Sequence, residues 1–314
     1  MKNKTIAFFL LGGIAVLLLI AASLQVNAQD GEGVYLPLVM GKPLPPPSGW
    51  VAFDSDRDGD QEIYRMRYDG SEVTQLTFNT GVYDVSPDWS PDGEQIAYVS
   101  SLTGEGEIYV MDADGSDQLK LTDLGHCGSP QWSPDGTKIA FHSRQDDNNI
   151  IFTMDPDGSN LTPITPPEFS GYDPYWSPDG QTIAFVSFRI PPGLYTVDAA
   201  GATPPVIIWE NEYLFQMAWS PDGEQFAVII SNGDPYTNIF DVYLYDLDTG
   251  KATRLTDGQH QNFTVDWFPV GNYLTFMSTL NGTDMEIYTM TTSGTQITNI
   301  TNNPAYEQSP DWIP

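Results

Sequence analysis

From residue 50 onward, short apolar segments alternate with turn sequences at a nearly constant interval. Each interval contains a large aromatic residue, a Ser-Pro-Asp-Gly turn and an apolar triplet such as Ile96-Ala97-Tyr98. A segment like Glu107–Asp112, an Asp-Gly turn and a segment ending in Leu-Thr or Ile-Thr follow. Apolar runs of this length between turn residues predict β-strands, and helical periodicity is absent between residues 50 and 314. We therefore predict four short strands in each interval.

One five-residue motif marks the repeat. Trp-Ser-Pro-Asp-Gly begins at four positions, Trp89, Trp132, Trp176 and Trp219, a degenerate copy begins at Trp267, and the last repeat has only Trp312. Successive tryptophans are 43 to 48 residues apart. Ser at the first position, Pro at the second and Gly at the fourth favour a type I turn. A fixed period of this length predicts a propeller that is built blade by blade.

The two ends of the repeat region complement each other. Trp50-Val51-Ala52-Phe53 matches the strand that elsewhere follows the turn, and Asp311-Trp312-Ile313 matches the strand that elsewhere precedes it. A C-terminal strand that completed the N-terminal blade would leave no open sheet edge. The predicted fold is therefore all-β: residues 50–314 form a six-bladed β-propeller of four-stranded antiparallel blades, closed by the C-terminal strand.

The N-terminal 49 residues differ from the repeats. Residues 1–28 have the pattern of a signal peptide, with Lys2 and Lys4 before an apolar run and Val26-Asn27-Ala28 as a cleavage site. The apolar run is also long enough to suggest an uncleaved anchor. Residues 29–49 are predicted to be a Pro-rich tether. Export to the periplasm, the cell surface or the medium is expected, without stable membrane insertion after cleavage.

The charge balance limits the classes of partner. The chain has 12 Lys and Arg residues against 42 Asp and Glu residues, a formal net charge of −30. Phosphate backbones would repel such a surface, so no nucleic-acid partner is predicted. The acidity is explained either by solubility of a monomeric all-β protein or by a calcium-rich or saline environment. The single cysteine, Cys127, permits no intrachain disulfide.

The repeat resembles a known family. Trp-Ser-Pro-Asp-Gly-x-x-Ile-Ala-Phe, followed by Glu-Ile-Tyr-Val-Met-Asp and Asp-Gly-Ser, is similar to the WD40-like PD40 repeat of TolB-like propellers, over residues 50–314. This resemblance implies that the tryptophan strands line a central channel. It also implies that the Ser-Pro-Asp-Gly turns lie on one rim and the loops before the tryptophan strands on the other. The additional N-terminal domain of TolB has no counterpart in the pattern, so the resemblance does not imply a role in the Tol-Pal system.

The rim formed by the loops before the tryptophan strands is the predicted binding site. Aromatic side chains, carboxylates and amides around a concave surface suit the recognition of a protein, peptide or glycan partner at the cell envelope. The candidate residues are Tyr83, Asp84, His126, Tyr172, Asp173, Tyr213, His260, Asn262, Tyr306 and Glu307. The alternative is that these aromatic residues only close the end of the core.

No catalytic residue is predicted. The Gly-x-Ser-x-Gly elbow of the hydrolases that accompany related propellers does not occur in the sequence. The alternative enzyme is a metal-assisted polysaccharide lyase or hydrolase that uses His126, His260 and nearby carboxylates, but the histidines lack ligand-like spacing. His142 interrupts an apolar segment and is predicted to be packed.

An acidic loop is a candidate calcium site. Asp54, Asp56, Asp58 and Asp60 alternate in the sequence, with Gly59 in the loop, and this spacing matches the start of a calcium-binding loop. The twelfth position holds Arg65 in place of the expected Glu. The alternative for this loop is an ordinary hairpin capped by the aspartates. If calcium does bind, a calcium-stabilised structural domain with no dedicated ligand is an alternative function for the whole protein. Apart from calcium, no cofactor is predicted.

Overall fold

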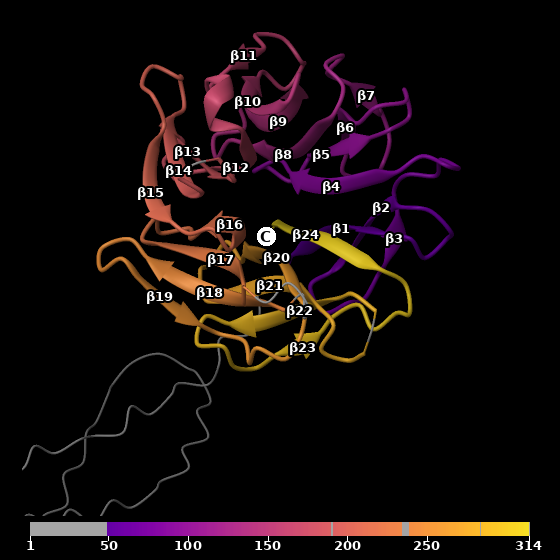
Figure 1. Ribbon diagram of the computed structural model, residues 1–314. Helices are drawn as coiled ribbons and strands as arrows, with labels where there is room; N and C mark the ends of the chain where they lie inside the picture. Colours follow the sequence, from indigo (N-terminus) through magenta and orange to yellow (C-terminus); the bar gives the residue numbers. More distant parts are fainter. Residues whose placement is uncertain (1–48, 190, 234–238, 283, 314) are drawn as a thin grey trace, which may run out of the picture. The chain divides into compact units, whose positions relative to one another are not determined.

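The computed structural model describes residues 49–189, 191–233, 239–282 and 284–313, which form six four-stranded antiparallel sheets around one axis (Figure 1). This arrangement confirms the predicted six-bladed propeller. The predicted signal peptide and nearly all of the predicted tether lie outside the described residues.

We number the blades from the seam and give each from its inner to its outer strand. Blade 1 consists of β24 (Glu307–Ile313), β1 (Trp50–Ser55), β2 (Glu62–Arg67) and β3 (Thr74–Gln75), and blade 2 of β4 (Asp84–Trp89), β5 (Gln95–Ser100), β6 (Glu107–Asp112) and β7 (Leu119–Lys120). Blade 3 consists of β8 (Cys127–Trp132), β9 (Ile139–Gln145), β10 (Asn148–Met154) and β11 (Thr162–Pro163), followed by a short 3₁₀ turn, η1 (Pro167–Phe169). Blade 4 consists of β12 (Gly171–Trp176), β13 (Thr182–Ser187), β14 (Gly193–Asp198) and β15 (Val206–Glu210). Blade 5 consists of β16 (Leu214–Trp219), β17 (Gln225–Ser231), β18 (Phe240–Asp246) and β19 (Lys251–Arg254), and blade 6 of β20 (Asn262–Trp267), β21 (Tyr273–Ser278), β22 (Glu286–Thr291) and β23 (Thr298–Asn299).

The Ser-Pro-Asp-Gly motif forms the predicted turn between the first two strands of a blade. In blade 2 the Gly93 N–H donates to the Ser90 carbonyl at 2.8 Å, and the Ser90 hydroxyl donates to the Asp92 carboxylate at 2.6 Å. Gly93 has a φ of 72°, which is favourable for glycine. The Ser90 hydroxyl and the Glu94 N–H lower the pKa of Asp92 by stabilising its charged form. The motif therefore specifies the hairpin.

Each inner strand carries a bulge, which falls at a Ser-Pro or Asp-Pro step in blades 1–4 and at a step without proline in blades 5 and 6. The pairing of β4 with β5 shifts register between Val85 and Asp88, and Ser86 has a φ of 54°. The next residue, Pro87, has no N–H to donate to a neighbouring strand. An innermost strand tolerates this loss because one of its edges faces the channel. The bulge thus turns backbone and side chains toward the axis.

The tryptophans pack between blades. The Trp176 indole N–H of blade 4 donates to the Gln131 carbonyl of blade 3 at 3.1 Å. At the seam, the Trp312 ring lies 3.6 Å from the Phe268 ring of blade 6, measured between centroids. The cores are therefore formed between neighbouring blades, and each blade depends on the next.

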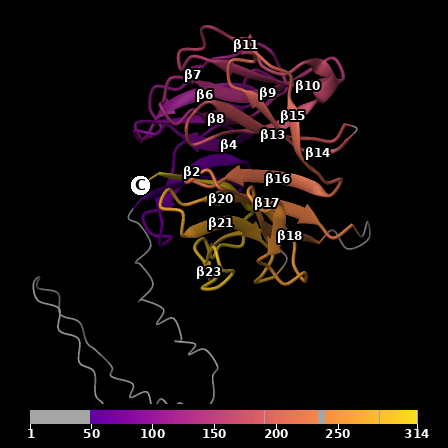
Figure 2. The same cartoon turned by 90° about the vertical axis from the view of Figure 1, so that its left-hand side faces the viewer.

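Blade 1 joins the two ends of the described chain. β24 pairs antiparallel with β1, from Trp50 opposite Ile313 to Ser55 opposite Glu307. Figure 1 shows the yellow β24 beside the indigo β1, and Figure 2 shows the same ring of blades turned by 90°. This pairing confirms the predicted closure by the C-terminal strand.

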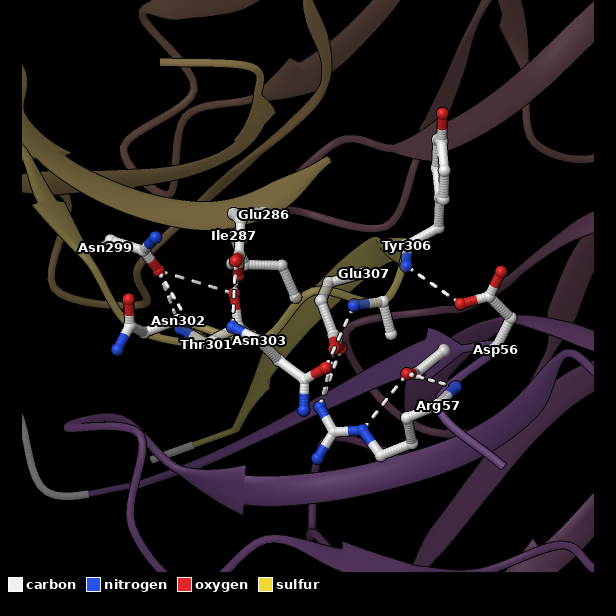
Figure 3. Close-up of polar contacts among 12 residues, drawn as sticks. Asp56, Arg57, Glu286, Ile287, Asn299, Thr301, Asn302, Asn303, Tyr306 and Glu307 are labelled. Carbon is white, nitrogen blue, oxygen red and sulfur yellow. Dashed lines mark hydrogen bonds and ion pairs between the residues drawn. The ribbon is translucent and has the colours of Figure 1, made fainter. Parts of the chain in front are cut away.

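Side chains of the β1–β2 hairpin reinforce the seam (Figure 3). Arg57 donates to both carboxylate oxygens of Glu307 at 2.8 Å, and the Asp56 carboxylate accepts from the Tyr306 N–H at 2.8 Å. Glu307 is completely buried, whereas the Arg57 side chain is 19% exposed. Burial raises the pKa of Glu307 to about 7 although Arg57 opposes this shift. The ion pair with Arg57 thus offsets part of the free-energy cost of burying the Glu307 carboxylate.

Replacing Arg57 by Ala is expected to destabilise the seam by about 3 kcal/mol at pH 8, because it leaves the buried Glu307 charge without a partner. Without Arg57 the pKa of Glu307 rises further, so the loss is smaller at pH 5, where Glu307 takes up a proton. Denaturant unfolding at both pH values measures the difference. Equal losses at the two pH values would contradict an electrostatic role.

Candidate functional site

The six inner strands surround a channel cavity of about 130 Å³. Asp88, Asp266 and Asp311 project into it, each one residue before a tryptophan. Asp88 accepts from the Trp132 N–H of blade 3 at 2.6 Å, and Asp311 accepts from the Trp89 N–H of blade 2 at 2.6 Å. These carboxylates therefore connect one inner strand to the next.

The channel carboxyls favour the protonated state. Burial raises the pKa of Asp88 to about 7 and that of Asp266 to about 6. Burial also raises the pKa of Asp311 well above its usual value, and the charges of Asp88 and Asp266 add to this effect. The Tyr175 hydroxyl donates to Asp266 at 2.6 Å. These contacts give the channel carboxyls partners within the ring, and the same three carboxyls also line a hollow of about 360 Å³ together with the tryptophans that follow them.

A continuous row of aromatic side chains lies at the mouth where the inner strands begin, which we call the loop mouth. Ring centroids are 5.3 Å apart for Tyr172 and Phe188, 5.9 Å for Phe188 and Phe215, 4.7 Å for Phe215 and Phe240, and 4.8 Å for Phe240 and Phe263. Phe188 is 47% exposed and Phe215 is 43% exposed. We call these five residues the aromatic arc.

The aromatic arc covers only half of the loop mouth. Tyr172, Phe215 and Phe263 are the second residues of the inner strands of blades 4, 5 and 6. The same positions of blades 2, 3 and 1 hold Val85, Gly128 and Gln308. The loop mouth is therefore chemically asymmetric, with a large apolar surface on blades 4–6.

His142 borders the aromatic arc. Its ring lies 5.7 Å from the Tyr172 ring, and a Cβ on Gly128 would meet it at 2.6 Å. Gly128 thus makes room for the imidazole. Burial lowers the pKa of His142, although the Asp173 carboxylate opposes this shift. The neutral ring therefore extends the apolar surface at physiological pH.

The predicted binding residues separate into exposed and buried groups. Tyr83, Tyr213 and Tyr306 are 43–45% exposed beside the inner strands of three blades. Tyr172 belongs to the aromatic arc, and Asp173 accepts from the Ser129 hydroxyl at 2.6 Å in the channel wall. These five residues are placed where a partner at the loop mouth could reach them.

Three of the predicted residues have internal partners instead. Asp84, Asn262 and Glu307 are at most 1% exposed. The Asn262 side-chain amide donates to the Phe240 carbonyl at 2.7 Å, and Asp84 accepts from Asn79 at 2.9 Å. Their surroundings fit a structural role at the start of the inner strands.

The two histidines of the alternative enzyme lie on separate blades. His126 precedes blade 3 and is 3.1 Å from the Glu105 carboxylate, and His260 precedes blade 6 and is 3.8 Å from the Asp257 carboxylate. Blades 4 and 5 separate them along the ring. Each histidine therefore has a local acidic neighbour on the surface rather than a shared site.

The aromatic arc was only partly visible in the sequence. Counting six residues before each tryptophan selects the exposed tyrosines, whereas counting four residues selects Tyr172, Phe215 and Phe263. Phe188 follows a second strand and has no such marker. Contact between neighbouring blades, which the sequence does not record, unites these residues into one surface.

The predicted calcium residues divide between two locations. The Asp54 carboxylate accepts from the Ser86 N–H at 3.1 Å, and Asp56 accepts from the Tyr306 N–H. Asp58 and Asp60 instead lie together with the buried Glu62.

The closed ring of six four-stranded blades defines a β-propeller. The chain belongs to the TolB beta propeller domain family, PD40, which matches residues 42–123 and 83–240. The family assignment agrees with the resemblance inferred from the repeat.

The known proteins similar to this chain have diverse descriptions. An uncharacterized protein of Agrobacterium fabrum is 32% identical over 121 residues, 38% of each chain, and an uncharacterized peptidase, YuxL, of Bacillus subtilis is 29% identical over 100 residues, 31% of this chain and 15% of its own. This chain thus matches well under half the length of these relatives. The crystal structure of TolB from Acinetobacter baumannii has a TM-score of 0.72 at 24% identity, covering 85% of this chain and 67% of that one. This structural likeness supports the fold alone.

Among the described residues, none of the helical segments has the length and apolar character needed to cross a bilayer.

Proposed function

We propose that this protein is an exported, non-enzymatic binding module that recognises a protein or peptide segment at the cell envelope through the aromatic arc. The observation that carries the proposal is the exposure of Phe188 and Phe215 within a continuous aromatic row. Contiguous exposed apolar surface on a soluble protein marks an interaction site. Rigid aromatic side chains are also the residues that dominate binding energy at protein interfaces.

The charge of the site indicates the chemistry of the partner. Asp173 lies in the channel wall beside Tyr172, and the chain as a whole has a net charge of −30. A partner segment with apolar side chains for the aromatic arc and a basic side chain for the channel would complement both features. Association is then expected to slow as salt concentration rises.

A displayed peptide library selected against the protein tests this proposal. Peptides recovered on the wild type are expected to bind a variant with Phe188→Ser and Phe215→Ser at least tenfold more weakly, because the substitutions remove two exposed anchors. Isothermal titration with the recovered peptides measures the change. Thermal melting of the variant reports whether the fold is retained.

Leu102→Ser is the matched control. Leu102 is 51% exposed in the β5–β6 hairpin, outside the aromatic arc. Its substitution should leave peptide affinity within a factor of two. Failure to recover any specific peptide, or peptides whose affinity does not depend on the two phenylalanines, would overturn the proposal.

A further inference from the structure

In four blades the third strand has a buried acidic residue at its first or second position. In three of them the carboxylate accepts hydrogen bonds from a threonine hydroxyl and from a backbone N–H of the loop that follows. The pairs are Glu107 with Thr122, Asp241 with Thr256, and Glu286 with Thr301, and the backbone donors are Gly125, Gly258 and Asn303. The repeat therefore supplies a standard way of satisfying this buried charge.

Glu62 of blade 1 departs from this pattern. Its side chain is completely buried, and neither carboxylate oxygen accepts a hydrogen bond of normal geometry among the described residues. Seven positions separate Thr77 from Asp84 in this loop, against five between Thr122 and Cys127 in blade 2. In the longer loop the Gly81 N–H donates to Asp60 at 2.5 Å rather than to Glu62. A buried carboxylate without a donor requires another partner.

Two aspartates of the β1–β2 hairpin face the Glu62 carboxylate. Ligand oxygens of Asp58, Asp60 and Glu62 all lie within 4.8 Å of one another. Calcium binds oxygen at 2.3–2.6 Å, so two ligands of the same ion are at most about 5 Å apart. Gly59, between the aspartates, has a φ of 123° and allows the tight turn.

The surroundings of the three carboxylates provide space and negative charge. Asp58 and Asp60 line a surface hollow together with Gln75 and Asn79. Burial raises the pKa of Glu62 to about 7, and the nearby Thr77 hydroxyl opposes this increase. Asp84 adds to the increase through its charge and through hydrogen bonding, and the charge of Asp58 adds as well. A cation in the hollow would remove this repulsion.

We propose that Asp58, Asp60 and Glu62 bind a calcium ion that fixes the turn of the β1–β2 hairpin against the start of β2. Three carboxylates supply charge and hard oxygen ligands, and water from the open side would complete the coordination shell. The rival explanation is a proton shared between Glu62 and Asp84, since the Asp84 carboxylate also has an oxygen without a donor. The two explanations differ in their response to calcium.

Calcium titration of the chelator-treated protein tests the proposal. With CaCl₂ as the probe, calorimetry is expected to show one ion that is lost in both Asp60→Asn and Glu62→Gln. Binding of that ion is expected to raise the melting temperature of the wild type, because the ion binds the folded hairpin and not the unfolded chain. MgCl₂ should compete weakly, because magnesium demands stricter octahedral geometry.

Glu105→Gln is the matched control. Glu105 lies two residues before Glu107 in blade 2, as Asp60 lies two residues before Glu62 in blade 1, but Glu107 already has hydrogen-bond donors. It should keep the same number of bound ions as the wild type. Stabilisation of Glu62→Gln in chelator shows that the variant folds and that the buried charge is costly. No calcium binding by the wild type, or unchanged binding by Asp60→Asn and Glu62→Gln, would overturn the proposal and favour the shared proton.

Discussion

Deleting residues 306–314 is expected to abolish the cooperative unfolding transition, or to lower the melting temperature by more than 15 °C. The deletion removes β24, so β1 becomes an exposed edge and blade 1 loses its inner strand. It also removes Trp312, which packs on Phe268, and a buried tryptophan alone contributes roughly 3–5 kcal/mol. Circular dichroism melting of the full and shortened chains measures the effect.

A synthetic peptide of residues 306–314 provides the control for this deletion. Added in excess, it should bind the open seam and raise the melting temperature again, because it restores the β1–β24 ladder. A shortened chain that melts at the temperature of the full one would show that closure does not hold the ring together.

Stability is expected to fall by the equivalent of at least 10 °C in melting temperature between pH 5 and pH 8, in the presence of chelator. Burial raises the pKa of seven carboxyls: Asp54, Glu62, Asp88, Asp266, Glu286, Glu307 and Asp311. The folded protein then binds more protons than the unfolded chain above about pH 4, so the stability from protonation is lost as pH rises through 6 to 7. For Asp54, a pKa of about 6 corresponds to about 3 kcal/mol.

The aspartates of the Ser-Pro-Asp-Gly turns determine how the stability falls at acid pH. Serine hydroxyls and backbone N–H groups lower the pKa of Asp92, Asp135, Asp179 and Asp222, so their contribution is lost as pH falls below about 4. The maximum stability is therefore expected near pH 5.

The Asp311→Asn variant measures how much the channel carboxyls contribute to the loss of stability between pH 5 and pH 8. The amide oxygen can still accept from the Trp89 N–H, and the amide replaces a carboxyl whose pKa burial raises well above its usual value. The variant should be more stable than the wild type at pH 8, with a flatter pH profile. Asp92→Asn on an exposed turn should be less stable than the wild type at pH 8. A steeper profile for Asp311→Asn would contradict the assignment.

The fold could be predicted from the sequence because the residues that determine each hairpin are adjacent in every repeat. The Ser-Pro-Asp-Gly turn needs only its own hydroxyl, carboxylate and glycine, so four residues define a hairpin. The complementary ends at Trp50 and Trp312 further predicted the closure that β1 and β24 form.

The candidate site was harder to predict from the sequence, because its residues come from neighbouring blades and because loop lengths determine which buried groups have partners. The contact of Phe188 with Phe215 joins blades 4 and 5, and no local motif records it. Glu62 lacks a hydrogen-bond donor because the loop that would supply it is two residues longer than its counterpart in blade 2. The sequence pattern showed only the alternating aspartates, and it therefore included Asp54 and Asp56 among the predicted ligands. Both features depend on contacts between segments that are distant in the sequence.

Site-specific photo-crosslinking tests the proposed binding surface most directly. Benzoylphenylalanine at Phe215 of the aromatic arc is expected to form covalent adducts with a partner in envelope extracts. The same group at Val270, which is 57% exposed in the turn after Trp267 at the opposite mouth, should form none. Adducts from position 270 with none from position 215 would contradict recognition at the loop mouth.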